Sequence, residues 1–121
     1  LRLGPDIAPD GFRERRVYRI LVAGELDGAR LAELRRLWRM EPGGDPADPR
    51  TRVVGSARRR LGDDHYVWEL RRIGGDVAWS VDLTVCLAGT DDTAVGLVLA
   101  ELRAALRRQH GLIPVTVERF S

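Results

Sequence analysis

Two neighbouring stretches of the chain alternate apolar and polar side chains with a period of two residues. They span residues 65–73 and 77–88, and one face of them consists of Tyr66, Trp68, Leu70, Val77, Trp79, Val81, Leu83, Val85 and Leu87. This alternation is typical of strands that bury one face of a sheet and leave the other open. The Gly74-Gly75-Asp76 sequence between them predicts a tight turn, so the two strands should form an antiparallel hairpin. Such a hairpin needs a second layer to cover its apolar face.

Two segments with helical periodicity can supply that layer. The first spans residues 29–40, with an apolar face made of Leu31, Leu34 and Trp38. The second follows Gly89, and its apolar stripe consists of Val95, Val98, Leu99, Leu102 and Leu106. Asp27 is the predicted N-cap of the first helix, and Thr90 or Asp91 that of the second. We expect both helices on one face of the sheet, covering Trp68, Trp79, Val81, Leu83 and Val85.

Three further segments have the composition of strands. Residues 17–24 are rich in β-branched and aromatic side chains, whereas residues 52–61 form a weaker candidate because Gly55 interrupts them. Residues 112–120 contain Pro114, which is typical of an edge strand or of a strand's first residues. The resulting order is β-α-β-β-β-α-β, and without the weak strand it is the split βαβ pattern of ferredoxin-like folds. We therefore predict an α+β fold with a ferredoxin-like antiparallel sheet and two helices on one face.

A chain of 121 residues has the length of one domain. We expect a flexible N-terminal segment at residues 1–14, without the apolar run of a signal peptide, and a single α+β domain at residues 15–121. The sequence has no run of about 18 apolar residues, so we predict no membrane partner. Cys86 is the only cysteine, which excludes an intramolecular disulfide and fits a reducing, cytoplasmic setting.

The charge of the chain is unusual in kind but small in sum. All 20 basic residues are arginines, and 18 acidic residues reduce the net charge to +2. So small an excess is not the electrostatic signature of a nucleic-acid-binding protein. The absence of lysine and asparagine matches the codon usage of a GC-rich bacterial genome. We therefore attach no functional meaning to the arginine content itself.

The sheet face opposite the helices is the most informative predicted surface. Its members are Arg19, Leu21, Ala23, His65, Val67, Glu69, Arg71, Ser80, Asp82, Thr84 and Cys86. Leu21 and Val67 are too apolar for a face open to water, so we predict that a second copy of the chain or another protein packs there. The partner-binding candidates are Arg19, Leu21, Val67, Glu69, Arg71 and Asp82, whose charged members could pair across a two-fold axis. The alternative is a solvated face on which those charges pair across strands.

A catalytic role for this face is a third interpretation. The candidates for acid–base or nucleophilic groups are His65, Glu69, Asp82 and Cys86. A nucleophilic Cys86 needs a base beside it, and the only other histidine, His110, fits better at a helix C-terminus. The sequence contains no metal-ligand spacing, glycine-rich phosphate loop or nucleophile elbow. We therefore predict no catalytic residue, no metal and no cofactor, and we favour a non-enzymatic protein.

The Arg-rich hairpin at residues 58–72 supports an alternative function. Arg58, Arg59 and Arg60 could contact phosphates, which predicts a nucleic-acid-binding module. The nearby Tyr66 and Trp68 could stack on bases, but the alternation directs them to the core face. Charges at the end of a hairpin also protect an edge strand from aggregation. Our main prediction is thus a small protein-interaction or regulatory domain, similar in strand order to small ferredoxin-like regulatory modules and without a motif specific to one family.

Overall fold

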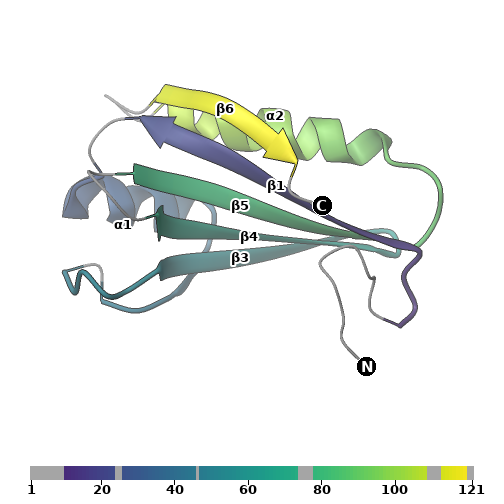
Figure 1. Cartoon of the computed structure of the whole chain (residues 1–121), viewed down its shortest axis with the longest axis horizontal. Helices are drawn as coiled ribbons and strands as arrows, with labels where there is room; N and C mark the ends of the chain where they lie inside the picture. The colour runs from purple at the N-terminus through teal and green to yellow at the C-terminus, as the bar shows by residue number, and fades with distance from the viewer. Residues whose placement is uncertain (1–9, 24–25, 46, 74–77, 109–112, 120–121) are drawn as a thin grey trace.

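The protein has an α+β fold in which one antiparallel sheet packs against two helices (Figure 1). The computed structural model describes residues 10–23, 26–45, 47–73, 78–108 and 113–119. In chain order the elements are β1 (Glu14–Ala23), α1 (Gly28–Leu37), β2 (Glu41–Pro42), β3 (Val53–Leu61), β4 (Asp64–Ile73), β5 (Ala78–Leu87), α2 (Thr93–Arg108) and β6 (Ile113–Arg119). Neither described helix is long and apolar enough to cross a lipid bilayer.

The described strands form a six-stranded sheet in the order β2-β3-β4-β5-β1-β6. Every neighbouring pair is antiparallel, so β1 and β4 run parallel to each other on either side of β5. Strands β2 and β3 extend the sheet beyond β4, and the order is that of a larger sheet than the predicted ferredoxin-like one. The α+β class and the antiparallel sheet are confirmed, whereas the ferredoxin-like assignment is not.

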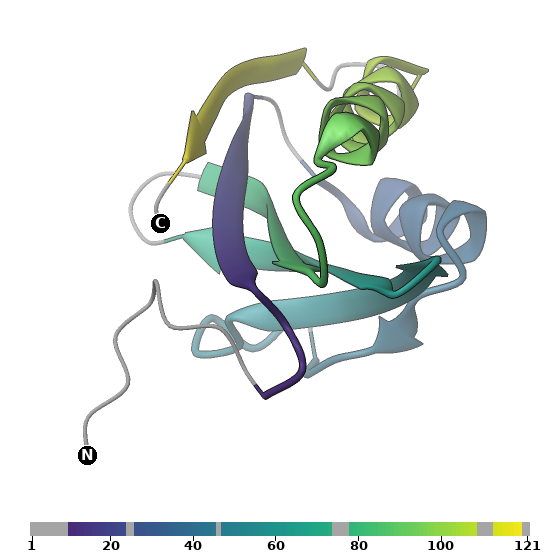
Figure 2. The ribbon, with the colours of Figure 1, turned by 90° about the vertical axis from the view of Figure 1, so that its right-hand side faces the viewer.

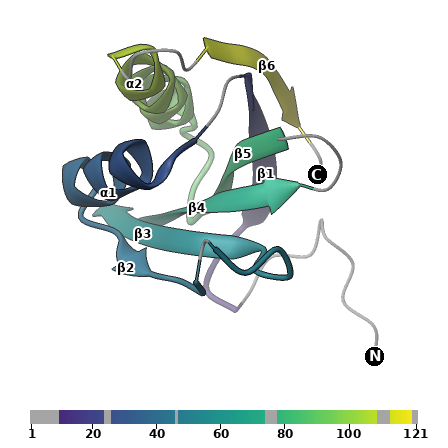
Figure 3. The ribbon, with the colours of Figure 1, turned by 90° about the vertical axis from the view of Figure 1, so that its left-hand side faces the viewer.

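The core lies between the sheet and the two helices, which occupy the same side of it (Figures 2 and 3). The predicted alternation is confirmed in β4, where Tyr66, Trp68 and Leu70 are buried. In β5 the buried apolar side chains are Trp79, Val81, Leu83, Val85 and Leu87. The helices contribute Leu31, Leu34, Val95, Val98, Leu102 and Leu106. The predicted turn at residues 74–76, His110 and the first nine residues of the chain lie outside the described residues.

Strand β2 was not predicted, because the sequence after α1 has the composition of a helix stop. Its two residues pair with β3, and the next two backbone amides, of Gly43 and Gly44, donate to the carbonyls of Val54 and Val53. A Cβ atom at Gly43 would collide with the Val53 carbonyl, so the close approach of the two backbones requires glycine. The pairing of β2 with β3 joins residues that are distant in the sequence, so local sequence patterns do not predict it.

Both helix starts are capped by aspartates, as predicted. The Asp27 side chain accepts a hydrogen bond of 2.9 Å from the Arg30 amide at the start of α1. Of the two candidates for α2, Asp91 makes the bonds, since its Oδ1 accepts from the amide and hydroxyl of Thr93 at 3.0 and 2.7 Å. These bonds stabilise the carboxylate and lower the pKa of Asp91.

Helix α1 ends in a Schellman arrangement with an arginine in the position that glycine usually occupies. The Met40 amide donates to the Arg35 carbonyl at 2.8 Å, and the Arg39 amide donates to the Arg36 carbonyl at 3.2 Å. This geometry puts Arg39 in the left-handed region, with φ of 50°. A residue with a Cβ atom is strained in that region, so the sequence carries a cost here that glycine would remove.

We therefore expect Arg39→Gly to stabilise the fold by about 1 kcal/mol, because it relieves the left-handed strain at the end of α1. Urea denaturation of the variant and the wild type would measure the difference. Arg39→Ala is the matched control, since it removes the guanidinium but keeps the Cβ atom. Equal free energies of unfolding for the glycine and alanine variants would contradict the strain.

Candidate functional site

The strand register gathers the predicted partner-binding residues on the sheet face opposite the helices. One row across the sheet joins Glu69 of β4, Asp82 of β5 and Arg19 of β1. The adjacent row joins Arg71, Ser80 and Leu21 in the same three strands. Because alternate residues of each strand point to opposite faces, these side chains lie on the face away from Trp68 and Leu83.

Asp82 is the centre of this face. Arg19 binds it with two hydrogen bonds, from Nε to Oδ1 at 2.9 Å and from Nη2 to Oδ2 at 2.8 Å. The Ser80 hydroxyl donates a third bond of 2.9 Å to Oδ1. Asp82 is only 6% exposed and Ser80 is fully buried, although both lie on the face without helices. The carboxylate is thus held in a shielded, fully hydrogen-bonded position, as a buried charge requires.

Arg71 links this pair to Glu69. Its guanidinium lies 3.8 Å from a carboxylate oxygen of Glu69 and 3.8 Å from one of Asp82. The four charged residues Arg19, Glu69, Arg71 and Asp82 therefore form one cluster, which we call the central charge cluster, with two positive and two negative groups. In a single chain these groups pair with one another, and the cluster carries no net charge.

Apolar and small side chains surround the central charge cluster. Leu21 and Val67 are half-buried, as are Thr84 and Cys86 of β5. Val17 of β1, which sequence reasoning did not single out, is opposite Thr84 in the register and is also half-buried. Ala23, at the end of β1, is exposed. The face therefore has a neutral polar centre and an apolar margin of small and medium-sized side chains.

The structure brings His65 and Cys86 to opposite positions of β4 and β5. The His65 ring packs edge-on against Phe12, with 4.9 Å between the ring centroids. Burial raises the pKa of the Cys86 thiol, which favours the protonated and unreactive form at neutral pH. Among the described residues, no hydrogen bond joins His65 to Cys86, and the pKa of the thiol is not lowered. The two side chains therefore do not form a nucleophile and its base.

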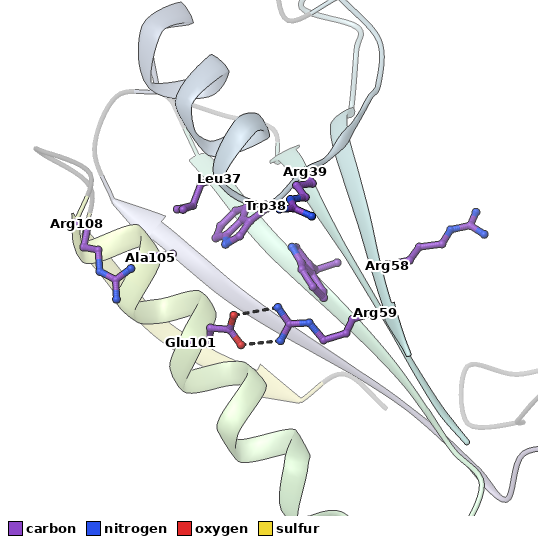
Figure 4. Close-up of a pocket in the computed structure, with 9 residues that line it drawn as sticks. Leu37, Trp38, Arg39, Arg58, Arg59, Glu101, Ala105 and Arg108 are labelled. Atoms are coloured by element: carbon purple, nitrogen blue, oxygen red, sulfur yellow. Dashed lines mark hydrogen bonds and ion pairs between the residues drawn. The ribbon is translucent and has the colours of Figure 1, made fainter. Parts of the chain in front are cut away.

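The three arginines of the hairpin do not form one cluster. Arg58 and Arg60 are exposed and pair in register with Val67 and His65, on the open side of the sheet. Arg59 points to the helix side, where it binds Glu101 of α2 with hydrogen bonds of 2.6 and 2.9 Å (Figure 4). Sequence reasoning grouped them because they are consecutive, whereas the alternation of a strand separates them.

A groove on the helix side was missed by sequence reasoning. It has a volume of about 360 Å³ and is lined by Leu37, Trp38, Arg39, Arg58, Arg59, Trp68, Glu101, Ala105 and Arg108 (Figure 4). It lies where the end of α1 approaches β3, β4 and α2. The helical and strand periodicities identified Trp38 and Trp68 as core residues, which their burial confirms. Neither pattern shows that both also line a cavity, because that depends on the spacing of the two helices.

Comparisons with protein-family models, with curated proteins and with solved structures find no match. Within the described part of the chain, no three side chains of the metal-ligating types gather into a site. The sheet face and the groove are therefore the two surfaces whose geometry and charge bear on function.

The buried pair in the central charge cluster leads to a stability prediction. We expect Asp82→Ala to destabilise the fold by about 2–3 kcal/mol, because it removes two hydrogen bonds from Arg19 and one from Ser80 at a buried position. Glu69→Ala is the matched control. Its ion pair with Arg71 is long, at 3.8 Å, and about a third of each side chain is exposed, so the substitution should cost less than about 1 kcal/mol. Chemical denaturation measures both values. Equal losses for the two alanine variants would contradict the central position of Asp82.

Proposed function

We propose that the protein is a non-enzymatic interaction domain that pairs with a second copy of itself through the sheet face opposite the helices. The observation that carries this proposal is the composition of that face, which combines a neutral, largely shielded charge cluster with a margin of half-buried apolar residues. A face that only met water would be expected to expose its charges.

The shielding of Asp82 favours contact with a partner. Its side chain is 9% exposed in the single chain, so folding has already removed most of the water from its carboxylate. A second sheet placed over the cluster would remove little further water from Asp82. Because the central charge cluster has equal numbers of positive and negative groups, the clusters of two copies would not repel each other.

The shape of the face also suits a symmetric contact. Ser80, Thr84 and Cys86 are small, and small side chains let a second sheet approach closely. A two-fold contact uses the same patch on both copies, so Leu21 and Val67 of one copy could pack against the same margin of the other. Stable interfaces bury about 800 Å² per partner, which is within the area of a sheet face of this size.

Two finer assignments belong to the same proposal. The parallel strands β1 and β4 are separated by β5 in the sheet and connected along the chain through α1, β2 and β3. They support a ferredoxin-like arrangement enlarged by β2 and β3. The unpaired Cys86 supports a reducing, cytoplasmic setting and a regulatory rather than a secreted protein.

We expect the wild-type protein to be a dimer at micromolar concentration and Val67→Glu to be a monomer, because the new carboxylate would be buried without a partner at the interface. Leu97→Glu is the matched control, since Leu97 is 69% exposed on α2, in the opposite layer. Light scattering coupled to size-exclusion chromatography would measure the mass of each. A monomeric wild type, or a dimer that survives Val67→Glu, would overturn the proposal. If the wild type is a monomer that binds a different protein through this face, the face is a binding surface but its partner is not a second copy of the chain.

Nucleic-acid binding is a second candidate, favoured by the exposure of Arg58 and Arg60 on one side of the hairpin. If both contact phosphates, the slope of log affinity against log salt should fall by about two units in the Arg58→Ala/Arg60→Ala variant. Arg59→Ala should leave the slope unchanged, because Arg59 is engaged with Glu101 on the other face. A salt titration of a labelled single strand measures the slopes. No binding at low salt would eliminate this candidate.

A further inference from the structure

The groove between the helices lies in the layer opposite the proposed dimer face and has the properties of a ligand site. Its volume of about 360 Å³ is within the range of small-molecule pockets. Leu37, Trp38, Trp68 and Ala105 give it apolar walls (Figure 4). Leu37 is 47% exposed, which is unusual for a leucine of this chain and marks the mouth of the groove as apolar. A bound molecule with an apolar part would cover this surface.

The charged groups of the groove are mostly cationic. Arg59 and Glu101 neutralise each other, and Arg59 also stacks over the Trp68 ring with its guanidinium carbon 5.2 Å from the ring centroid. The same pair lowers the pKa of Glu101, so this acid stays ionised. The side chains of Arg39 and Arg108 make no hydrogen bond or ion pair with the described residues. Arg58 also borders the groove, but its side chain points away from it (Figure 4). The lining therefore leaves the guanidinium groups of Arg39 and Arg108 available for a ligand.

The position of Arg39 supports a role for its side chain. It occupies the left-handed position at the end of α1, with φ of 50°, where glycine would be less strained. Arginines at the ends of helices have a simpler explanation, since they interact with the negative end of the helix dipole. That explanation accounts for Arg107 and Arg108 in the last turn of α2. It does not account for an arginine at a strained backbone position.

The hydrogen-bonding groups of the groove are also mostly donors. Besides the two arginines, Trp68 lines the groove and its indole Nε1 is buried with no partner among the described residues. The single carboxylate, of Glu101, already accepts both of its bonds from Arg59. A ligand that matches this lining supplies acceptors and negative charge, together with an apolar part.

We propose that the groove binds a small organic anion, with an apolar ring packed against Leu37 and Trp38 and a phosphate or carboxylate group bound by Arg39. Arg108 lies on the other side of Leu37 and Trp38, where it adds positive charge to the groove without sharing that contact (Figure 4). Guanidinium groups suit both kinds of anion because they bind two acceptor oxygens at once. The two remaining parts of the site have separate roles. The ring determines affinity through apolar contact, and the two arginines determine the sign of the charge that is accepted.

Nuclear magnetic resonance of the three tryptophan indole groups tests this site directly. Phenyl phosphate and benzoate are the probes, one for each kind of anion, and inorganic phosphate tests the anionic group alone. We expect at least one aromatic probe to shift the Trp38 and Trp68 signals in a saturable way at concentrations up to about 10 mM. The signal of Trp79, which is buried beneath Arg72 elsewhere in the sheet, should stay in place. No saturable shift would overturn the proposal, as would inorganic phosphate that binds as tightly as phenyl phosphate.

Three variants separate ligand binding from folding. Arg39→Gly should weaken binding of the aromatic anion about fivefold or more, because it removes a charged hydrogen-bond donor. Arg108→Gln should weaken binding by a smaller factor, because it removes only a nearby positive charge. Arg107→Gln is the matched control, since Arg107 is the exposed neighbour that does not line the groove. Arg39→Gly should also raise the melting temperature by about 3 °C, so its loss of affinity could not be attributed to poor folding. Unchanged affinity in both groove variants would contradict the assignment of the two arginines.

Discussion

The two helices cover only one face of the sheet. A strand residue is therefore part of the core or of the open face according to the side to which its side chain points. The closed layer between sheet and helices buries Tyr66, Trp68 and the alternate residues of β5. Removing this apolar surface from water is the main favourable contribution to folding. The opposite face has no such layer among the described residues, yet Ser80 and Asp82 are buried there. Arg19 and Arg71 shield the Asp82 carboxylate on this face, which no helix among the described residues covers.

The sequence predicts the parts of this fold that depend on local patterns. The two-residue alternation of β4 and β5 identified the buried face, and the aspartates before the helices identified their starts. Strand β2 could not be predicted in this way, because Glu41 and Pro42 become a strand only through pairing with Ser56 and Gly55. A Pro-Gly-Gly sequence is a helix stop by local rules, and the tertiary contact adds a second role to the same residues.

The sequence predicts the face on which a strand residue lies, but it does not predict contacts that depend on the whole sheet or on the spacing of the helices. Alternation placed Arg19 and Asp82 on one face, but the register that makes them partners is set by the whole sheet. Alternation also separates Arg59 from Arg58 and Arg60, although the three are consecutive in the chain. The groove was beyond prediction because it depends on the distance between helices that are far apart in sequence. The one local feature that points to the groove is Arg39, an arginine at a position where a helix commonly ends in glycine.

The two surfaces differ in how their arginines are held, and this difference separates their roles. Arg19 is bound by Asp82 through two hydrogen bonds, so its charge is used within the chain. A partner over the central charge cluster meets a surface without net charge and would recognise it mainly by shape. Arg39 and Arg108 have no acid partner among the described residues, so their charge is available to a ligand. A chain with a net charge of only +2 can therefore contain a local cationic site, because four arginines and a single acid, Glu101, line the groove.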